Sequence, residues 1–469
     1  MKSTGTLART ARTHSVIIRL VVIGALLLAL LLPLLAVQGL VREREQRRAE
    51  TESELIQSWG GEQTIAGPIL TVPYVVHTLN DNGKRIETVE AAHFLPDSLL
   101  IEGRVNPETR RRGMYEVTLY GTTLAISGSF HAPDFSGWRV SPGAILWDEA
   151  VLSVEIPDMR ALQERVDLRM SPGATGKGQK KEFRSGRGSV GMFPGEIRVA
   201  LPELGAARAG TAADIPFSFD LTLRGGGSLG FLPLGDQTTV RISSPWKSPN
   251  FSGAYLPASR SLTDGGFDAE WKVISMARAY PQRWMGGEIS PETVRDSAFR
   301  VSLMTPVDTY LKVTRALKYG LLFLFLPFFT LFLFEVFSAK RIHPLQYLFV
   351  GFADCIFYFL LLSLSEHIAF GLAYGIASVC STGLITAYTA AIVRSWKKGV
   401  VMLPVLGAAY GFLAVVLNSE DYALLFGSIG LFLILAVVMV LTRRVDWYRP
   451  GFRRTESGAI APADAPKGD

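Results

Sequence analysis

Cysteine and charge are both scarce in this chain of 469 residues. Only two cysteines occur, Cys355 and Cys380, and both lie in apolar runs. Neither a disulfide framework nor a zinc knuckle can be built from two such residues. Charged residues make up 19% of the chain and hydrophobic residues 48%, whereas soluble globular proteins contain roughly 25% charged residues. This composition argues against a disordered or wholly soluble protein and indicates membrane spans.

Motifs for catalysis and for metal binding are also lacking. The sequence contains no HExxH, GxSxG or CxxC pattern, and its six histidines never fall at metal-ligand spacing. Two GxGxxG patterns, at 186–191 and 225–230, do not stand between a predicted strand and a predicted helix, as phosphate binding at a helix N-terminus requires. We therefore expect no catalytic, cofactor-binding or metal-binding residue, and we expect that the protein is not an enzyme.

The small net charge of +6 argues against a nucleic-acid partner, because nucleic-acid binding needs concentrated positive charge. Much of the excess lies in loops beside apolar runs. The lipid bilayer is the partner that this distribution indicates.

Apolar runs long enough to cross a membrane occur at both ends of the chain. A spanning helix needs about 20 apolar residues. The first run, 16–37, is longer than the apolar region of a signal peptide, and no small-x-small cleavage site follows it, so we predict an uncleaved anchor. Five further spans are predicted at 319–337, 345–364, 368–392, 400–417 and 422–441.

Basic residues in the connecting loops set the predicted orientation. The loops 338–344 and 394–398 carry Lys or Arg, as does the segment after the last span, whereas the loops 365–367 and 418–421 carry neither. Short basic loops stay in the cytoplasm. Both termini are therefore predicted in the cytoplasm and the long polar stretch outside. The arginines at 42–48 disagree, but they open a long translocated domain, where the rule has little force.

The polar stretch between the first two spans is predicted to be a large all-β, sandwich-like domain. Short β-rich runs alternate there with Gly, Pro and Asn or Asp breaks. Segments 122–137 and 238–253 match at eight of sixteen positions, which favours a duplication of two β modules. The predicted order is a cytoplasmic N-terminus (1–15), span one (16–37), a juxtamembrane helix (38–58) that Gly60 and Gly61 end, β module 1 (59–170), a flexible basic loop (171–191), β module 2 (192–306), a stem helix (307–318), spans two to six (319–441) and a cytoplasmic tail (442–469).

The two matching segments end in PDFSG (133–137) and PNFSG (249–253). An Asp or Asn followed by a Gly suits a turn, because these residues tolerate turn geometry. We predict structural turns in which Phe135 and Phe251 pack. The alternative is that the paired turns display a shared binding edge.

Ionisable residues within the predicted spans are the candidate site residues, because a charge in lipid is costly. Asp354 lies near the middle of span three, and helical spacing places Tyr358 and Ser365 on its face. Glu366 and His367 end this span on its outer side. A hydrogen-bonded packing role is one interpretation of Asp354, and a proton or ion relay is the other.

Two further features concern how the spans pack. Glu335, near the inner end of span two, lies within reach of Lys340 or Arg341 in the sequence. Gly371 and Gly375, like the pair Gly407 and Gly411, have the spacing that lets helix backbones approach. Packing within the bundle is the simpler interpretation, and a homo-oligomer interface is the alternative.

Several long segments resemble a known family. They are SWGGEQTIAGPILTVPY within 47–74, RRRGMYEVTLY at 110–120, FSGAYLPASRSLTDGGFDAEWKV at 251–273, PVDTYLKVTRALKYG at 306–320 and LQYLFVGFADCIFYFLLLSLSEH at 345–367. Together they resemble the CreD family of bacterial inner-membrane proteins, from about residue 16 to 448. The resemblance implies a periplasmic outer domain and a role in envelope integrity and stress response. It supplies no catalytic residue.

Three functions follow from these observations. Binding or scaffolding through the outer domain is favoured, with an envelope protein or a periplasmic ligand as the partner and no cofactor. A transporter or channel using Asp354 is the first alternative. A membrane enzyme acting on an envelope lipid or glycan is the second.

Overall fold

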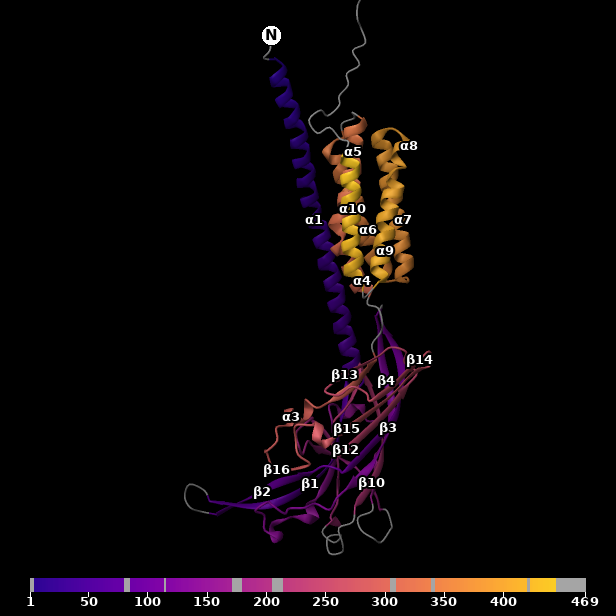
Figure 1. The fold of residues 1–469 in the computed structure, drawn as a ribbon. Coiled ribbons are helices and arrows are strands. Elements are labelled where there is room, and N and C mark those ends of the chain that lie inside the picture. Colours follow the sequence, from indigo (N-terminus) through magenta and orange to yellow (C-terminus); the bar gives the residue numbers. More distant parts are fainter. Residues whose placement is uncertain are drawn as a thin grey trace, which may run out of the picture. The chain divides into compact units, whose positions relative to one another are not determined.

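The chain divides into two compact units in a computed structural model. One unit comprises Met1–Arg47 with Val307–Asp469, and the other comprises Arg48–Pro306; we call them the helical unit and the sheet unit (Figure 1). The structure describes residues 4–79, 85–113, 115–170, 179–204, 214–303, 309–338, 342–419 and 422–443.

The helical unit is built from long apolar helices. Its described helices are α1 (Thr4–Ser58), which continues into the sheet unit, α4 (Thr309–Lys318), α5 (Gly320–Ser338), α6 (Pro344–Ser365), α7 (Phe370–Val393), α8 (Trp396–Gly399), α9 (Met402–Asn418) and α10 (Ala423–Thr442). After α1 the backbone φ angles of Gly60 and Gly61 are 113° and 76°, which glycine adopts without steric cost. The helix therefore ends where the sequence predicts.

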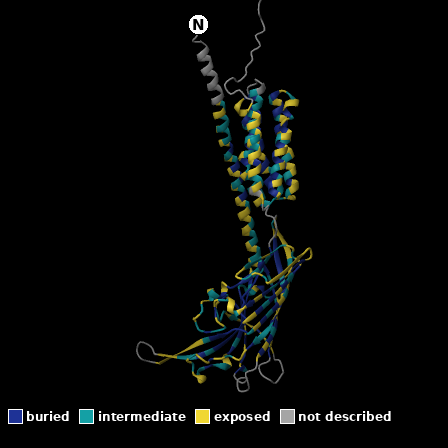
Figure 2. Ribbon diagram, in the orientation of Figure 1, coloured by how far each residue is buried: buried dark blue, intermediate teal, exposed yellow. Residues whose placement is uncertain are grey.

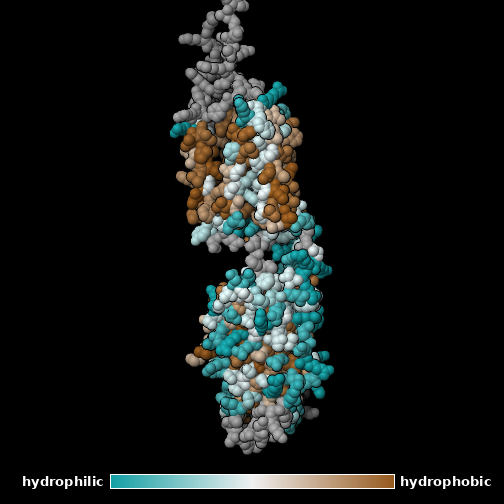
Figure 3. All heavy atoms as spheres, turned by 90° about the vertical axis from the view of Figure 1, so that its right-hand side faces the viewer, coloured by the Kyte–Doolittle hydropathy of each residue, from teal (hydrophilic) through white to brown (hydrophobic). Residues whose placement is uncertain are grey.

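Five of the described helices are long and apolar enough to cross a membrane, or six if the bent pair α4 and α5 forms one span. Many of their exposed side chains are large and apolar, including Leu372, Val379 and Phe432. Figure 3 shows hydrophobic atoms gathered over these helices and hydrophilic atoms over the sheet unit. Figure 2 shows exposed residues interspersed with buried ones along the described helices of the bundle, and the span in α10 is the least buried of them. Such an apolar outer surface fits a lipid environment.

The predicted stem helix belongs to the helical bundle instead. α4 meets α5 at an angle of 46° and buries Tyr310, Val313 and Ala316 in the apolar cluster formed with the neighbouring helices. Lys312 lies over the ring of Phe370, 5.3 Å from its centroid. The three buried residues recur every third position, so they share one helix face. Residues 307 and 308 of the predicted stem lie outside the described residues.

Among its described residues, the sheet unit contains two large sheets, the end of α1 and the short α-helix α3 (Pro291–Arg295). The strands of the first sheet are β1 (Gln63–Leu79), β2 (Arg85–Phe94), β5 (Val151–Ile156), β8 (Arg184–Arg187), β9 (Gly195–Ala200), β11 (Ser228–Phe231), β13 (Pro249–Gly253), β16 (Arg283–Met285) and β17 (Phe299–Leu303). Those of the second are β3 (Ser98–Arg112), β4 (Tyr115–Phe130), β6 (Asp167–Met170), β7 (Gln179–Glu182), β10 (Ile215–Gly226), β12 (Gln237–Ser244), β14 (Ser259–Thr263) and β15 (Gly266–Ile274).

Both sheets are mixed. The first runs β13-β17-β11-β1-β5-β9-β8, with β2 paired to β1 and β16 paired to β2, and the second runs β14-β15-β12-β3-β4-β10-β6-β7. The pairs β1·β11 and β3·β12 are parallel, and the other pairs between the described strands are antiparallel. With its short helix and several 3-10 turns, the domain is sheet-rich, and the all-β prediction is approximate.

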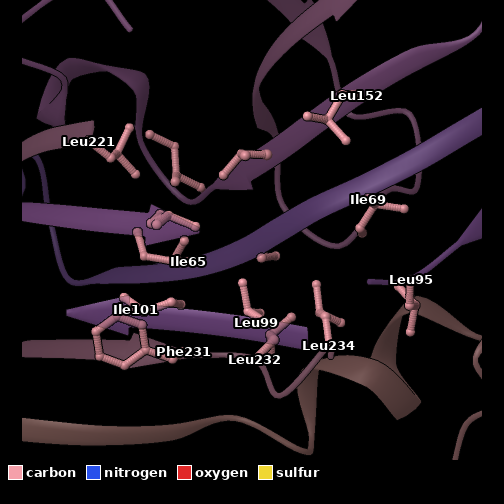
Figure 4. Close-up of a cluster of buried hydrophobic side chains, with 14 of the residues drawn as sticks. Ile65, Ile69, Leu95, Leu99, Ile101, Leu152, Leu221, Phe231, Leu232 and Leu234 are labelled. Carbon is pink, nitrogen blue, oxygen red and sulfur yellow. The ribbon is translucent and has the colours of Figure 1, made fainter. Parts of the chain in front are cut away.

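The two sheets face each other across one apolar core (Figure 4). Ile65, Ile69 and Leu152 come from the first sheet, and Leu99 and Ile101 come from the second. All five are almost completely buried. Each such side chain contributes about 1.5–3 kcal/mol of burial free energy. The apolar residues that alternate with polar ones along the strands point to one face of each sheet, and these faces form the core.

The two predicted β modules do not form separate domains. β12, from the second predicted module, pairs with β3 from the first, and β10 pairs with β4. The strands that follow the matching segments at the same offset, β5 and β15, lie in different sheets. Strand pairing thus gives no support to a duplicated fold, and the sequence match is local.

The predicted flexible basic loop is partly strand. Residues 171–178 lie outside the described residues, but the following residues form β7, paired with β6, and β8, paired with β9. The ammonium of Lys180 lies 2.8 Å from Asp167, and that of Lys181 lies 2.5 Å from Glu203. These basic residues are therefore held in local ion pairs.

The two PxFSG segments differ in structure. Residues 133–137 form the predicted turn, in which the Asp134 carboxylate accepts hydrogen bonds from the backbone and hydroxyl of Ser136. Residues 249–253 form the strand β13 instead, paired with β17, so the turn prediction is wrong there. Phe135 is buried, and Phe251 is half-buried against Phe267 and Trp271. Both phenylalanines pack as predicted.

Candidate functional site

A polar cluster inside the helical unit surrounds Asp354. This residue lies in the middle of α6 and has no exposed surface. The hydroxyl of Tyr410, on α9, lies 3.1 Å from Asp354 Oδ1 and 3.1 Å from Ser381 Oγ on α7. The Ser381 hydroxyl also lies 3.3 Å from the carbonyl oxygen of Ala353. Three helices thus meet at one hydrogen-bonded carboxyl group.

The cluster contains buried polar atoms that no described residue satisfies. They are Asp354 Oδ2 and the Tyr358 hydroxyl on α6; farther along α7, the hydroxyls of Thr386 and Thr389 are also buried without a partner among the described residues. A buried polar group without a partner costs about 1–3 kcal/mol. In a membrane, such groups mark places where a proton, a water molecule or a ligand group would be stabilised.

The five predicted site residues do not form one cluster. Asp354 and Tyr358 are both buried in α6. The Ser365 hydroxyl donates a hydrogen bond to the carbonyl of Leu362 in its own helix. Glu366 and His367 lie in the turn that follows α6. Tyr410, which contacts Asp354, and Ser381, which contacts Tyr410, come from other helices, so spacing along span three could not reveal them.

Glu366 takes part in a separate contact at its own end of the bundle. Its carboxylate lies 3.8 Å from the guanidinium of Arg44 on α1 and accepts a hydrogen bond from the Tyr310 hydroxyl of α4 at 3.2 Å. This Arg–Glu–Tyr group joins α1, α4 and the end of α6. It gives Glu366 a structural partner.

A second Arg–Glu–Tyr group lies at the start of α6. The Arg19 guanidinium on α1 donates to Glu335 Oε1 of α5, and the Tyr347 hydroxyl donates to Glu335 Oε2 at 3.3 Å. The sequence suggested Lys340 or Arg341 as the partner of Glu335; both lie outside the described residues, and Arg19 holds Glu335 in the structure. Arg19 stands 316 residues away in the sequence, so no local pattern predicts the pair.

The two groups are spaced to match a bilayer. Arg19 and Arg44 are 25 residues apart on one helix, which is about 38 Å at 1.5 Å per residue. A bilayer measures about 30 Å across its hydrocarbon core and about 40–45 Å with its headgroups. The separation of the two arginines thus falls between these two thicknesses, and each arginine has its carboxylate partner beside it. Asp354 lies between them in depth, because it occupies the middle of α6.

In the sheet unit, the first GxGxxG pattern encloses a carboxylate of the protein itself. Glu155 on β5 is fully buried. Its Oε1 accepts hydrogen bonds from the backbone amides of 190 and 191, and its Oε2 from those of 192 and 193, at 2.8–3.1 Å. A Cβ at Gly188 would lie 2.7 Å from the carbonyl oxygen of Phe193. The glycine-rich loop is thus shaped around Glu155, which gives this pattern a structural role.

Glu196 on β9 stands directly opposite Glu155 in the strand pairing and is also fully buried. Its Oε1 accepts a hydrogen bond from the Ser189 hydroxyl, while its Oε2 has no partner among the described residues. Desolvation raises the pKa of Glu196, and the neighbouring Glu155 carboxylate raises it further. The two opposed carboxyl groups therefore have different surroundings.

The second sheet has an open edge at β14. All five residues of β14 are exposed, and the strand pairs only with β15 among the described strands. A cavity of about 480 Å³ lies beside it, lined partly by Arg241, Glu102 and Glu270. The Arg241 guanidinium lies 2.9 Å from each of these two carboxylates. The edge and the cavity form one polar surface.

Metal binding has no candidate in the part of the chain that is described. No group of three or more His, Cys, Asp or Glu side chains there is placed to hold a metal ion. Cys355 is buried and Cys380 is exposed, and both are free thiols.

Comparison with known proteins gives two matches that cover nearly the whole chain. A family model described as "Inner membrane protein CreD" matches residues 15–448. The protein named inner membrane protein CreD of Escherichia coli (strain K12) is 31% identical over 430 residues, which cover 91% of this chain and 92% of that protein.

Proposed function

Because the chain belongs to the CreD family of inner membrane proteins, we propose that it supports cell-envelope integrity under stress by binding or scaffolding through its sheet unit. The observation that supports this proposal is the open β14 edge beside the polar cavity. An unpaired strand edge offers backbone donors and acceptors to an incoming extended segment. The proposed partner is an extended segment of an envelope protein. No catalytic step and no cofactor form part of the proposal.

The proposal includes a membrane topology. In this proposed topology the chain has six spans, with α4 and α5 counted as one, both termini lie in the cytoplasm and the sheet unit lies in the periplasm. The basic loops at 394–398 and after α10 support this orientation through the distribution of positive charge. The spacing of Arg19 and Arg44 supports α1 as the first span.

Crosslinking in cells tests the proposed edge. A photoreactive amino acid at Ser261, an exposed residue of β14, should capture an envelope protein from the periplasmic side. The matched control is Ala125, which is exposed in the interior strand β4, where both strand edges are already paired. We expect strong capture from Ser261 and little from Ala125, read out by mass spectrometry of the adduct.

Equal capture from both positions would contradict recognition through the strand edge. Capture of a second copy of this chain from Ser261 would replace the proposed partner with a homo-oligomer. The absence of any adduct from either position would count against binding through this face.

A second candidate function, proton or ion transport, is favoured by the unpaired Oδ2 of Asp354. We nevertheless expect Asp354→Asn to leave abundance and envelope phenotype nearly intact. Asparagine keeps the size of the side chain and accepts the Tyr410 hydrogen bond, and it removes only the titratable proton. The measurement is survival under envelope stress at matched protein level.

Asp354→Glu is the control for the titratable group. If Asp354→Asn abolishes function at normal abundance while Asp354→Glu retains it, the packing role is wrong and the relay is supported. If both variants lose function together with abundance, the residue is structural.

A further inference from the structure

The helical unit contains a cavity beside the Arg19–Glu335 ion pair. Its volume is about 360 Å³, which lies within the range of small-molecule sites. Its lining residues come from α1, from the end of α5 and from the segment that begins α6; they are Ile18, Arg19, Val22, Ile23, Leu26, Glu335, Ile342, His343, Pro344 and Tyr347. The cavity therefore combines one ion pair with apolar walls.

Both charges in this cavity have hydrogen-bonding capacity to spare. A guanidinium carries five N–H donors, and Nη1 of Arg19 is the nitrogen that contacts Glu335. A carboxylate can accept about four hydrogen bonds, and from the described residues Glu335 accepts one from Arg19 and one from Tyr347. The side chain of Arg19 is 28% exposed, and that of Glu335 is 7% exposed. The pair can thus receive an anionic and a cationic group at once.

The depth of the cavity matches a lipid headgroup. It lies where α5 ends and α6 begins, at the end of two helices whose lengths fit the hydrocarbon core. Farther along α1 from Arg19, Val22 and Leu26 continue the apolar wall of the cavity. A ligand with a charged head and an apolar tail fits both parts.

We propose that this cavity binds the headgroup of an aminophospholipid. The guanidinium of Arg19 holds the phosphate, and the Glu335 carboxylate, fixed by Tyr347, accepts hydrogen bonds from the primary ammonium. The first part of an acyl chain lies along Val22 and Leu26. An anionic headgroup without an amine leaves Glu335 unused, and a quaternary ammonium has no N–H to donate to it.

The test uses the purified, delipidated full-length chain in detergent and native mass spectrometry. The probes are phosphatidylethanolamine, phosphatidylcholine and phosphatidylglycerol with the same acyl chains. We expect phosphatidylethanolamine to bind about tenfold more tightly than the other two, as one charge-assisted hydrogen bond provides. Equal binding of the three lipids would overturn the proposal.

Soluble phosphoethanolamine should not compete with phosphatidylethanolamine for the cavity. If it competes at equal concentration, the site takes a free headgroup and the lipid assignment is wrong.

Substitutions locate the effect. Glu335→Gln should remove the preference for the primary amine and leave the affinity for phosphatidylcholine unchanged. Val22→Trp adds bulk to the apolar wall and leaves both charged residues in place, so it should weaken the binding of all three lipids. This variant tests the site independently if Glu335→Gln folds poorly. The matched control is Arg44→Gln, which removes the α1 arginine of the other Arg–Glu–Tyr group. It should leave the preference for phosphatidylethanolamine unchanged. A Glu335→Gln protein that keeps the tenfold preference contradicts the proposed role.

Discussion

Replacing Glu155 by glutamine should lower the free energy of unfolding of the sheet unit by about 3–5 kcal/mol. The carboxylate accepts four backbone hydrogen bonds from residues 190–193. Glutamine offers one oxygen, and its NH₂ group would face two of the four amide donors. Those donors, which lie in buried or part-buried surroundings, would then lose their partner.

Glu196→Gln is the matched control for Glu155→Gln. It lies opposite Glu155 in the same strand pair, but its Oε2 has no partner among the described residues. Glutamine keeps the acceptor for Ser189 and removes a buried charge. We expect thermal unfolding of the full chain in detergent to show a loss of about 10 °C for Glu155→Gln and no loss for Glu196→Gln.

The pH dependence of the control follows from the raised pKa of Glu196. A carboxyl group whose pKa is higher in the folded than in the unfolded protein stabilises the fold below its unfolded pKa. That contribution is lost as the pH rises through the folded pKa. Glu196→Gln should therefore gain stability over the parent at neutral pH, and the gain should shrink as the pH falls toward 4.5, the ordinary value. A gain that grows in acid would contradict this account of Glu196.

Phe135→Ala should cost about 3 kcal/mol of unfolding free energy. The ring is surrounded by the rings of Tyr74, Phe94, Trp138 and Trp147 at centroid distances of 5.4–6.3 Å. Removing it leaves a cavity that these large rings fill poorly. The measurement is again thermal unfolding of the full chain in detergent.

Phe251→Ala and Ser252→Ala provide the comparison for Phe135→Ala. Phe251 is half-buried, so its loss should cost less, about 1–2 kcal/mol, and Ser252→Ala should be mild. If both phenylalanine variants unfold like the parent but lose a crosslinked partner, these segments form a contact surface and the packing role is wrong.

The sequence predicts those parts of the fold that depend on local patterns. Apolar runs of about 20 residues mark the long helices, and Gly60 with Gly61 marks the end of α1. The sequence also contains the signal for the burial of α4, because Tyr310, Val313 and Ala316 recur at helical spacing. The predicted stem helix (307–318) therefore carries an apolar face that packs into the bundle.

Contacts between distant segments could not be predicted in this way. The pairs Arg19–Glu335 and Tyr410–Asp354 join residues 316 and 56 positions apart, and no repeat or spacing links them. The pairing of β12 with β3 is equally non-local, because strand order depends on the whole sheet. One signal was available for the sheet unit: Glu155 is a single charge inside the otherwise buried strand β5, and such a charge requires a partner.

Thiol labelling tests most directly the central claim that the sheet unit works in the periplasm. Cys355 and Cys380 are first replaced, and single cysteines are then introduced at Ser136, an exposed residue of the sheet unit, and at Ser395, between α7 and α8. A membrane-impermeant reagent applied from the periplasm should label Ser136→Cys in intact inner membranes and should label Ser395→Cys only after permeabilisation. Labelling of both positions from the same side would contradict the topology on which the proposed function depends.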